Sequence, residues 1–237
     1  MTLAQGVEMQ QRYAMAAQGI SMADFITPRG EMEMVGETAV INISGALVKS
    51  APPIHEKLGN TTYDTLNAEM DAALEAGATS AVFHIDSGGG GVVGLAEMSD
   101  KIASMGIPTY AFSDSVACSA AYHAMAACDH VHVTPSANIG NIGVVTAFSG
   151  EDNNNIQVIT NEGADLKGAG MNGLTETQAS FIQSRVDKLG EEFKIHINNH
   201  RTVDAEVFRA GWYYGEEALA LGLADSDGTK EQLLSNI

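Results

Sequence analysis

Residues 80–106 read SAVFHIDSGGGGVVGLAEMSDKIASMG, and this stretch decides the fold class. Its first part, SAVFHID, is a short apolar run typical of a buried strand. Four consecutive glycines, Gly88 to Gly91, come next, and VVGLAEMSDKIASMG then has the composition of a helix that ends at Gly106. A strand, a glycine turn and a helix in this order predict a βαβ unit with a parallel sheet.

The same alternation continues on both sides of this stretch. Upstream, ETAVINISGAL predicts a strand from Thr38, and TTYDTLNAEMDAALEAG predicts a helix that stops at Gly77. Downstream, strands are predicted at PTYAFSD, HVHVT, IGVVTAF and NIQVIT, and a helix is predicted at CSAAYHAMAAC. We therefore predict an α/β protein with a largely parallel sheet and helices packed on it.

A long helix is predicted from about Thr175 to His200. It begins with a capping box formed by Thr175 and Gln178, and apolar residues recur after it at helical spacing. Residues 1–35, in contrast, are rich in Met and Gln and contain the helix-breaking sequence PRG. We interpret 1–35 as an N-terminal arm or accessory helix and 36–237 as one domain.

Composition excludes several classes of function. The 237 residues are 45% hydrophobic, which is enough for a buried core, and the net charge is −18. So acidic a chain without a basic cluster is not expected to bind nucleic acid or an anionic membrane surface. The N-terminus has no basic segment followed by an apolar one, as a signal peptide would, and no run of about 18 apolar residues occurs. We therefore predict a cytoplasmic protein without membrane insertion.

The glycine turn allows three interpretations. Gly89 to Gly94 fits GxGxxG, and Asp114 follows about twenty residues later, a pattern typical of dinucleotide binding. Alternatively, exposed N–H groups of the glycine run can donate hydrogen bonds to a developing oxyanion on a substrate carbonyl. The third interpretation is a tight turn without any ligand.

Two candidate nucleophiles lie in DSVACSAAY, where a strand passes into a helix. Cys118 and Ser119 both lie at the helix start, where free N–H groups favour a nucleophile, although small residues there also allow close packing. Between Lys101 and Arg185 the only Lys or Arg is Lys167, in the glycine-rich sequence GADLKGAGMNG. Because a lysine that is desolvated beside a serine can act as a neutral general base, a Ser-Lys pair is the candidate chemistry.

The histidines do not predict a metal site. His130 and His132 share one strand face, and His196 and His200 share one helix face, but neither pair has the Glu of HExxH or a clear third ligand. His123 lies four residues after the candidate serine on the same helix, so we assign it a role in packing or in supporting the site residues. We predict neither a metal nor a cofactor.

Four sequence blocks, spread over about residues 38–225, resemble the signal peptide peptidase A family of Ser-Lys peptidases. Within that family they resemble the phage type that processes procapsid proteins. The blocks are IDSGGGGV (85–92), DSVACSAAY (114–122), PSANIGNIGV (135–144) and GADLKGAG (163–170).

The resemblance implies a role for individual residues. Ser119 corresponds to the nucleophile, Lys167 to the general base, and the N–H groups of Gly90 and Ala120 to the oxyanion hole, with Gly89 shaping the turn. A further position departs from the family pattern: Asn141 replaces a serine that orients the lysine, and its side chain can still accept a hydrogen bond from an amine.

The resemblance also implies the fold and the biological setting. It implies a ClpP/crotonase-like βαβ superhelical core with a flanking long helix, and a homo-oligomer in which serine and lysine meet across a protomer interface in some relatives. The expected substrates are capsid, portal or scaffold proteins in the host cytoplasm or procapsid. A housekeeping signal peptide peptidase and an inactive peptidase-like assembly scaffold are the alternatives.

Overall fold

A computed structural model describes residues 28–148, 159–171 and 173–237. These residues form two compact units, each of which is described by itself. The first unit contains the chain up to Ile142 together with His196–Ile237, and the second is Gly143–Ile195. Within the described residues, no helix has both the length and the apolar character needed to cross a membrane.

The first unit is built on a sheet whose strands are mostly parallel. Its strands are β1 (Glu33–Val35), β2 (Thr38–Val48), β3 (Thr61–Thr62), β4 (Ser80–Gly90), β5 (Thr109–Ser113), β6 (Val116–Cys118), β7 (His130–Val133), β8 (Asn138–Gly140), β9 (Trp212–Tyr214) and β10 (Ser226–Asp227). Only the β1–β2 and β8–β9 pairs among them are antiparallel. The predicted parallel α/β sheet is therefore confirmed.

Strand β4 has different neighbours at its two ends. Its first half pairs with β5, with Ala81 opposite Thr109, whereas near its end Ser87 pairs with Ala117 of β6. Strand β2 follows the other side of β4 along almost its whole length. This change of neighbour places the glycine-rich end of β4 beside the strand that leads into Ser119.

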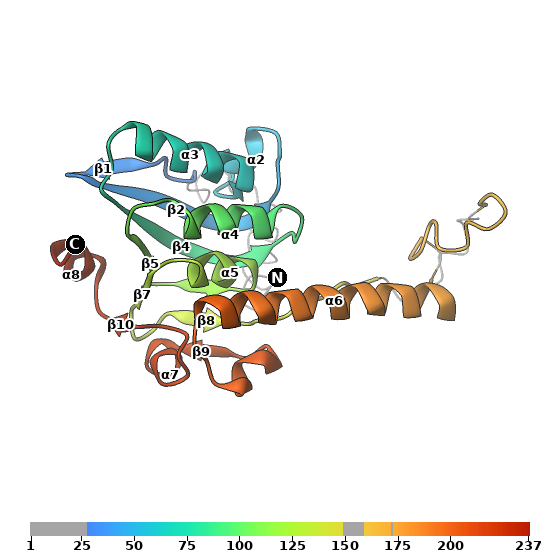
Figure 1. The fold of residues 1–237 in the computed structure, drawn as a ribbon. Coiled ribbons are helices and arrows are strands. Elements are labelled where there is room, and N and C mark those ends of the chain that lie inside the picture. The colour runs from blue at the N-terminus through green and yellow to red at the C-terminus, as the bar shows by residue number, and fades with distance from the viewer. Residues whose placement is uncertain (1–27, 149–158, 172) are drawn as a thin grey trace, which may run out of the picture. The chain divides into compact units, whose positions relative to one another are not determined.

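Helices cover the sheet on both faces. The first unit contains α2 (Ile54–Lys57), α3 (Tyr63–Glu75), α4 (Leu95–Ala103), α5 (Ala120–Ala126), α7 (Gly215–Ala220), α8 (Lys230–Ser235) and the 3₁₀ helix η2 (Ala205–Arg209). Helices α3, α4 and α5 lie side by side over one face (Figure 1). On the other face Leu233 of α8 packs against Val40, Val82 and Phe112. Alternation along β2 and β4 supplies apolar side chains to both layers.

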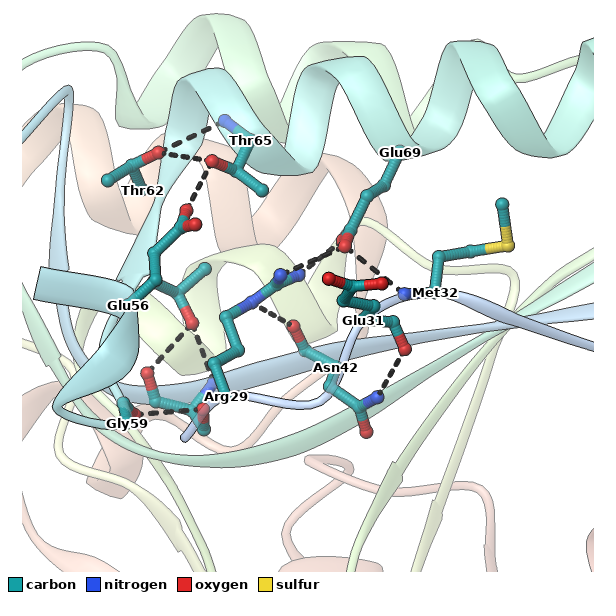
Figure 2. Close-up of polar contacts among 11 residues, drawn as sticks. Arg29, Glu31, Met32, Asn42, Glu56, Gly59, Thr62, Thr65 and Glu69 are labelled. Carbon is teal, nitrogen blue, oxygen red and sulfur yellow. Dashed lines mark hydrogen bonds and ion pairs between the residues drawn. The ribbon is translucent and has the colours of Figure 1, made fainter. Parts of the chain in front are cut away.

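A buried ion pair holds the beginning of the described chain on the domain (Figure 2). Arg29 and Glu69 of α3 form a bidentate salt bridge, and their side chains are only 3% and 13% exposed. Arg29 also donates from Nε to the Asn42 carbonyl at 3.0 Å and from its backbone N–H to the Glu56 carbonyl at 3.1 Å. Because each buried charge has its partner, this network fixes where the segment crosses the sheet edge.

The segment that follows Arg29 joins the sheet directly. Strand β1 pairs with β2, with Glu33 opposite Val40 and Val35 opposite Thr38. Residues 28–35 of the predicted arm thus belong to the first unit, and residues 1–27 lie outside the described residues. The boundary at residue 35 stays a prediction.

Two further predictions have different outcomes. The long helix is α6 (Glu176–His200), and Thr175 and Gln178 exchange the two bonds of the predicted capping box at 3.2 Å each. The strand predicted at IGVVTAF, residues 142–148, is wrong, because the structure has no strand there and Val145 is 84% exposed. The sequence NIQVIT lies mostly outside the described residues.

Candidate active site

Ser119 lies at the turn from β6 into α5 in a strained conformation. Its φ and ψ angles are 55° and −125°, an uncommon combination for a residue with a side chain. Its N–H donates to the Gly140 carbonyl at 2.8 Å, and its own carbonyl accepts from the His123 N–H at 3.0 Å. Because the hydroxyl does not cap the helix, the turn presents this side chain without using it structurally.

Gly89 on β4 lies directly against this turn. Its φ is 101°, and a Cβ atom added to it would lie 2.8 Å from the Ser119 Cβ and 2.9 Å from the Ala120 nitrogen. The Gly89 N–H donates to Ser87 Oγ at 3.0 Å, and that hydroxyl donates to the Gly45 carbonyl at 2.6 Å. Only glycine fits this backbone and this space.

The two expected oxyanion donors belong to segments in contact. Ala120 is the first residue of α5, so its N–H has no acceptor within the helix. Gly90 follows Gly89 and is the last residue of β4, where it pairs with Leu47. A Cβ at Gly90 would collide with the Leu47 backbone, so Gly90, like Gly89, has no room for a side chain.

Asn141 is connected to Ser119 through one residue. It follows Gly140, the residue whose carbonyl binds the Ser119 N–H. Its backbone N–H donates to the Gly211 carbonyl at 2.6 Å and its Nδ2 donates to the Ala210 carbonyl at 2.8 Å. Since the amide nitrogen is used in this way, the amide oxygen is the atom that can accept a hydrogen bond from an amine.

Lys167 lies in the second unit, on an exposed turn spanning residues 165–170. Its N–H donates to the Ala164 carbonyl at 3.1 Å. Gln178 at the start of α6 donates to the carbonyl of Asp165 at 2.8 Å, so the turn is attached to the helix. The structure thus brings Ser119, Gly89, Ala120 and Asn141 together in the first unit, and the role of Lys167 stays a prediction.

Cys118 does not have the properties of a nucleophile. Its side chain is buried, and burial raises the pKa of its thiol to about 12. The Sγ atom donates to the Asn138 carbonyl at 3.5 Å. Because the thiolate is the reactive form of cysteine, burial of this kind favours Ser119 of the two neighbours.

The dinucleotide interpretation has little support from the glycine run. Strand β4 extends to Gly90, and the Gly91 N–H donates to the Leu47 carbonyl at 2.7 Å, so it is not free for a phosphate. Asp114, the expected ribose ligand, lies 3.2 Å from His84 Nε2. The glycines therefore act as a strand end beside Ser119 rather than as a phosphate loop.

A column of histidines supports the helix that carries Ser119. The His123 and His196 rings stack 3.5 Å apart, and the His200 ring lies 4.6 Å from that of His196. His123 Nδ1 is hydrogen-bonded to Ser99 Oγ at 2.8 Å, and His196 Nε2 lies 2.9 Å from the His123 carbonyl oxygen. The sequence alone did not predict this column, because His123 lies on α5 and its two partners lie on α6, more than 70 residues later.

The column predicts a pH-dependent stability. Burial, and next the neighbouring His196 and His200, lowers the pKa of His123 to about 3, and burial lowers that of His196. An unfolded chain has ordinary histidines with a pKa near 6.5, so between these values it binds more protons than the folded chain. These histidines therefore do not destabilise the fold above about pH 6.5, and the free energy of unfolding falls as the pH decreases below that value.

We expect the unfolding free energy to decrease by up to about 1.4 kcal/mol per pH unit for each such histidine. Urea unfolding at pH 7.5, 6.5 and 5.5 measures this slope. The His123→Asn variant, which removes one of the titrating rings from the column, is expected to have a shallower slope than wild type. Equal slopes in the two proteins would show that the column does not cause the effect.

The second histidine pair also has a structural role. His130 Nε2 and His132 Nδ1 lie 2.6 and 2.7 Å from Ser226 Oγ and so join β7 to β10. Asp225 lies 3.8 Å from His130 Nδ1 and is bonded to Arg201 at 2.5 Å. In the part of the chain that the structure describes, no group of His, Cys, Asp or Glu side chains is arranged to hold a metal ion.

Known proteins resemble this chain in sequence. The capsid assembly protease C of Escherichia phage lambda is 26% identical over 205 residues, 81% of this chain and 47% of the relative. The head-tail preconnector protein GP5 of Enterobacteria phage P21 is 27% identical over 216 residues, 86% of this chain and 43% of the relative. The chain spans less than half the length of these relatives.

Solved structures share the fold. A serine-to-alanine mutant of the 1510-N membrane-bound stomatin-specific protease has a TM-score of 0.51 at 15% identity, covering 83% of this chain and 82% of that one. A lysine-to-alanine mutant of the same protease in complex with a substrate peptide gives 0.51 at 16% identity, over 83% and 77%. This likeness confirms the predicted ClpP/crotonase-like fold.

The decisive comparison is with a protein family. Residues 101–237, which include Ser119, Asn141 and Lys167, match the sequence profile of peptidase family S49. The match covers more than half of the chain, and it confirms the resemblance found in the four sequence blocks. The chain therefore belongs to peptidase family S49.

Proposed function

We propose that this protein is a serine endopeptidase that uses Ser119 and Lys167 as a catalytic dyad and processes phage head proteins during capsid maturation. The observation that carries the proposal is the strained turn at Ser119, whose φ of 55° is held by Gly140 and by the start of α5. Strain of this kind persists where the surroundings over-determine it, typically at functional sites.

In the proposed reaction Ser119 Oγ attacks the carbonyl carbon of the scissile peptide bond while its proton passes to the neutral amine of Lys167. The protonated amine then donates that proton to the leaving nitrogen, which leaves an ester on Ser119. Water attacks the ester with Lys167 again accepting the proton, which the amine then passes to Ser119 Oγ as the acid product leaves, so that neutral Lys167 and free Ser119 are restored. Neither a metal nor a cofactor takes part.

The oxyanion of each tetrahedral intermediate would accept hydrogen bonds from the N–H groups of Gly90 and Ala120. The support for this assignment is the contact of Gly89 with both Ser119 and the Ala120 nitrogen. Donors that are already fixed by a strand and a helix start need little reorganisation when charge develops. Asn141 would orient the Lys167 amine through its amide oxygen.

The proposed substrates follow from the relatives. One is named a capsid assembly protease and the other a head-tail preconnector protein, and both come from phages. Similarity over more than 80% of this chain supports phage capsid, portal or scaffold proteins as substrates and a homo-oligomer acting in the host cytoplasm or procapsid.

The proposal is tested by incubating the full chain with an unfolded protein and, separately, with a coexpressed phage capsid protein. We expect new termini at reproducible positions in both, identified by mass spectrometry. Unchanged masses with correctly folded protein would contradict peptidase activity and favour a non-catalytic assembly role. Cleavage of signal peptides but not of capsid protein would favour a housekeeping role.

Gly89→Ala is expected to reduce cleavage about 10²- to 10³-fold, because the new methyl group displaces Ser119 and the Ala120 donor. Gly77→Ala is the matched control, since Gly77 has a φ of 81° and no atom lies within 4 Å of its added Cβ. Both variants suffer backbone strain, but only in Gly89→Ala does the new methyl group contact the site. Similar kcat/KM losses in the two variants would refute the assigned contact.

A further inference from the structure

Two half-exposed aromatic side chains project from an edge strand near the proposed active site. Trp212 and Tyr214 of β9 are 52% and 50% exposed, and their ring centroids lie 5.5 Å apart at an interplanar angle of 83°. Tyr213 between them is half-buried and donates its hydroxyl to the Glu206 carbonyl at 3.3 Å. Large exposed aromatic side chains in contact with each other are typical of recognition sites.

Strand register connects this aromatic pair to Ser119. Cys118 on β6 pairs with Gly140 on β8, and Gly140 pairs with Trp212 on β9. Neighbouring strands are about 4.8 Å apart, so the Trp212 backbone lies about 10 Å from the residue that precedes Ser119. A polypeptide bound at Ser119 would reach this distance with about three extended residues.

A carboxylate contacts the pair, and others lie on the elements next to β9. Glu217 accepts the Tyr214 N–H at 2.9 Å, and the adjacent Glu216 lies in the exposed first turn of α7. On the other side Glu206 is 3.3 Å from Arg209. Burial and, next, the negative charge of Glu206 raise the pKa of Tyr213, and the second of these causes indicates a negative potential around its hydroxyl. One cation does not neutralise these three carboxylates, and the whole chain carries a net charge of −18.

An aromatic face next to carboxylates has a defined binding preference. A guanidinium or ammonium group is attracted to the face of a tryptophan ring and then to the adjacent negative charges. The aliphatic stem of arginine or lysine is at the same time covered by the second ring. An acidic or neutral side chain gains nothing comparable here.

We propose that Trp212 and Tyr214 form a specificity site for an arginine or lysine of the substrate polypeptide, a few residues from the scissile bond. This inference rests on the proposed function, because it assigns the substrate class of the same site. It also explains why β9 carries exposed aromatic residues that the fold does not use in its core.

The chain offers a direct probe of this site, because Trp212 is its only tryptophan. The Ser119→Ala protein is used because it should bind a peptide without cleaving it. It is titrated with an unstructured dodecapeptide that contains two arginines, and tryptophan fluorescence is recorded. The same peptide with glutamines in their place is the matched ligand. We expect saturable quenching and a Kd about five- to tenfold lower for the arginine peptide, with the difference shrinking at high salt.

Two variants test the contribution of the local charge. Glu217→Gln keeps an acceptor for the Tyr214 N–H but removes the charge, so it is expected to lower the preference for arginine about threefold. Glu75→Gln, which removes an exposed carboxylate of α3 instead, is the matched control and is expected to bind like the parent. Equal Kd values for the two peptides would overturn the inference.

Cleavage assays distinguish this inference from the proposed function. If the wild-type protein cleaves peptides but the fluorescence titration gives no lower Kd for the arginine peptide, the function stands and the specificity site is refuted. If the arginine peptide binds more tightly but no peptide is cleaved, the aromatic pair binds basic side chains, and the peptidase function and the pair's role in substrate specificity are both refuted.

Discussion

Ser119→Ala is expected to abolish peptide cleavage, with kcat falling about 10⁴- to 10⁶-fold. The reason is that the proposed reaction passes through an ester on Ser119 Oγ, and alanine cannot form it. The fold should remain intact, because the Ser119 hydroxyl caps no helix and the backbone bonds to Gly140 and His123 do not involve the side chain.

The measurement is kcat on a peptide that the wild-type protein cleaves, with thermal unfolding as the check of the fold. Ser104→Ala is the matched control, since Ser104 is an exposed serine of the same unit whose hydroxyl bonds the backbone carbonyls of Asp100 and Lys101 at 2.7 and 3.4 Å. It should retain wild-type activity. A Ser119→Ala protein that still cleaves at more than a few per cent of the wild-type rate would refute the proposed nucleophile.

Lys167→Ala is expected to cause a loss of similar size, because no other group of the proposed site takes the proton from Ser119. Lys167→Arg sharpens the test. Arginine keeps the positive charge but does not lose its proton in proteins, so a charge role would survive this change and a base role would not. We therefore expect both variants to be inactive, as measured by kcat on the same peptide.

Lys188→Ala is the matched control for these two variants. Lys188 is an exposed lysine of the same unit, and its ammonium group lies 3.6 Å from Glu192 on α6. Activity equal to wild type is expected. If Lys167→Arg retained activity, Lys167 would act through its charge, and the dyad would be refuted.

A mixture of inactive variants locates the dyad. Ser119→Ala and Lys167→Ala proteins are coexpressed, and cleavage is measured. Recovery of about a quarter to a half of the wild-type activity would mean that serine and lysine of different protomers meet. Absence of recovery from a correctly assembled mixture would place both residues of a working dyad in one protomer.

Most regular elements could be predicted from the sequence, because their signals are local. The capping box of Thr175 and Gln178 involves residues three apart, and α6 begins directly after it. The SAVFHID run and the glycines after it likewise mark β4. The predicted strand at 142–148 failed because an apolar run forms a strand only when a neighbouring strand binds its backbone, which periodicity does not report.

By itself, the sequence determined the α/β alternation, the family and the identity of the candidate site residues, since these depend on residue type, order and short spacing. Only the tertiary structure decided that Gly89 contacts Ser119, that Ser119 has a positive φ, and that His123 stacks on His196. The physical reason is that each of these features joins segments about 30 or more residues apart, or depends on such a junction. Strand and helix packing creates them, and no local pattern along the chain contains them.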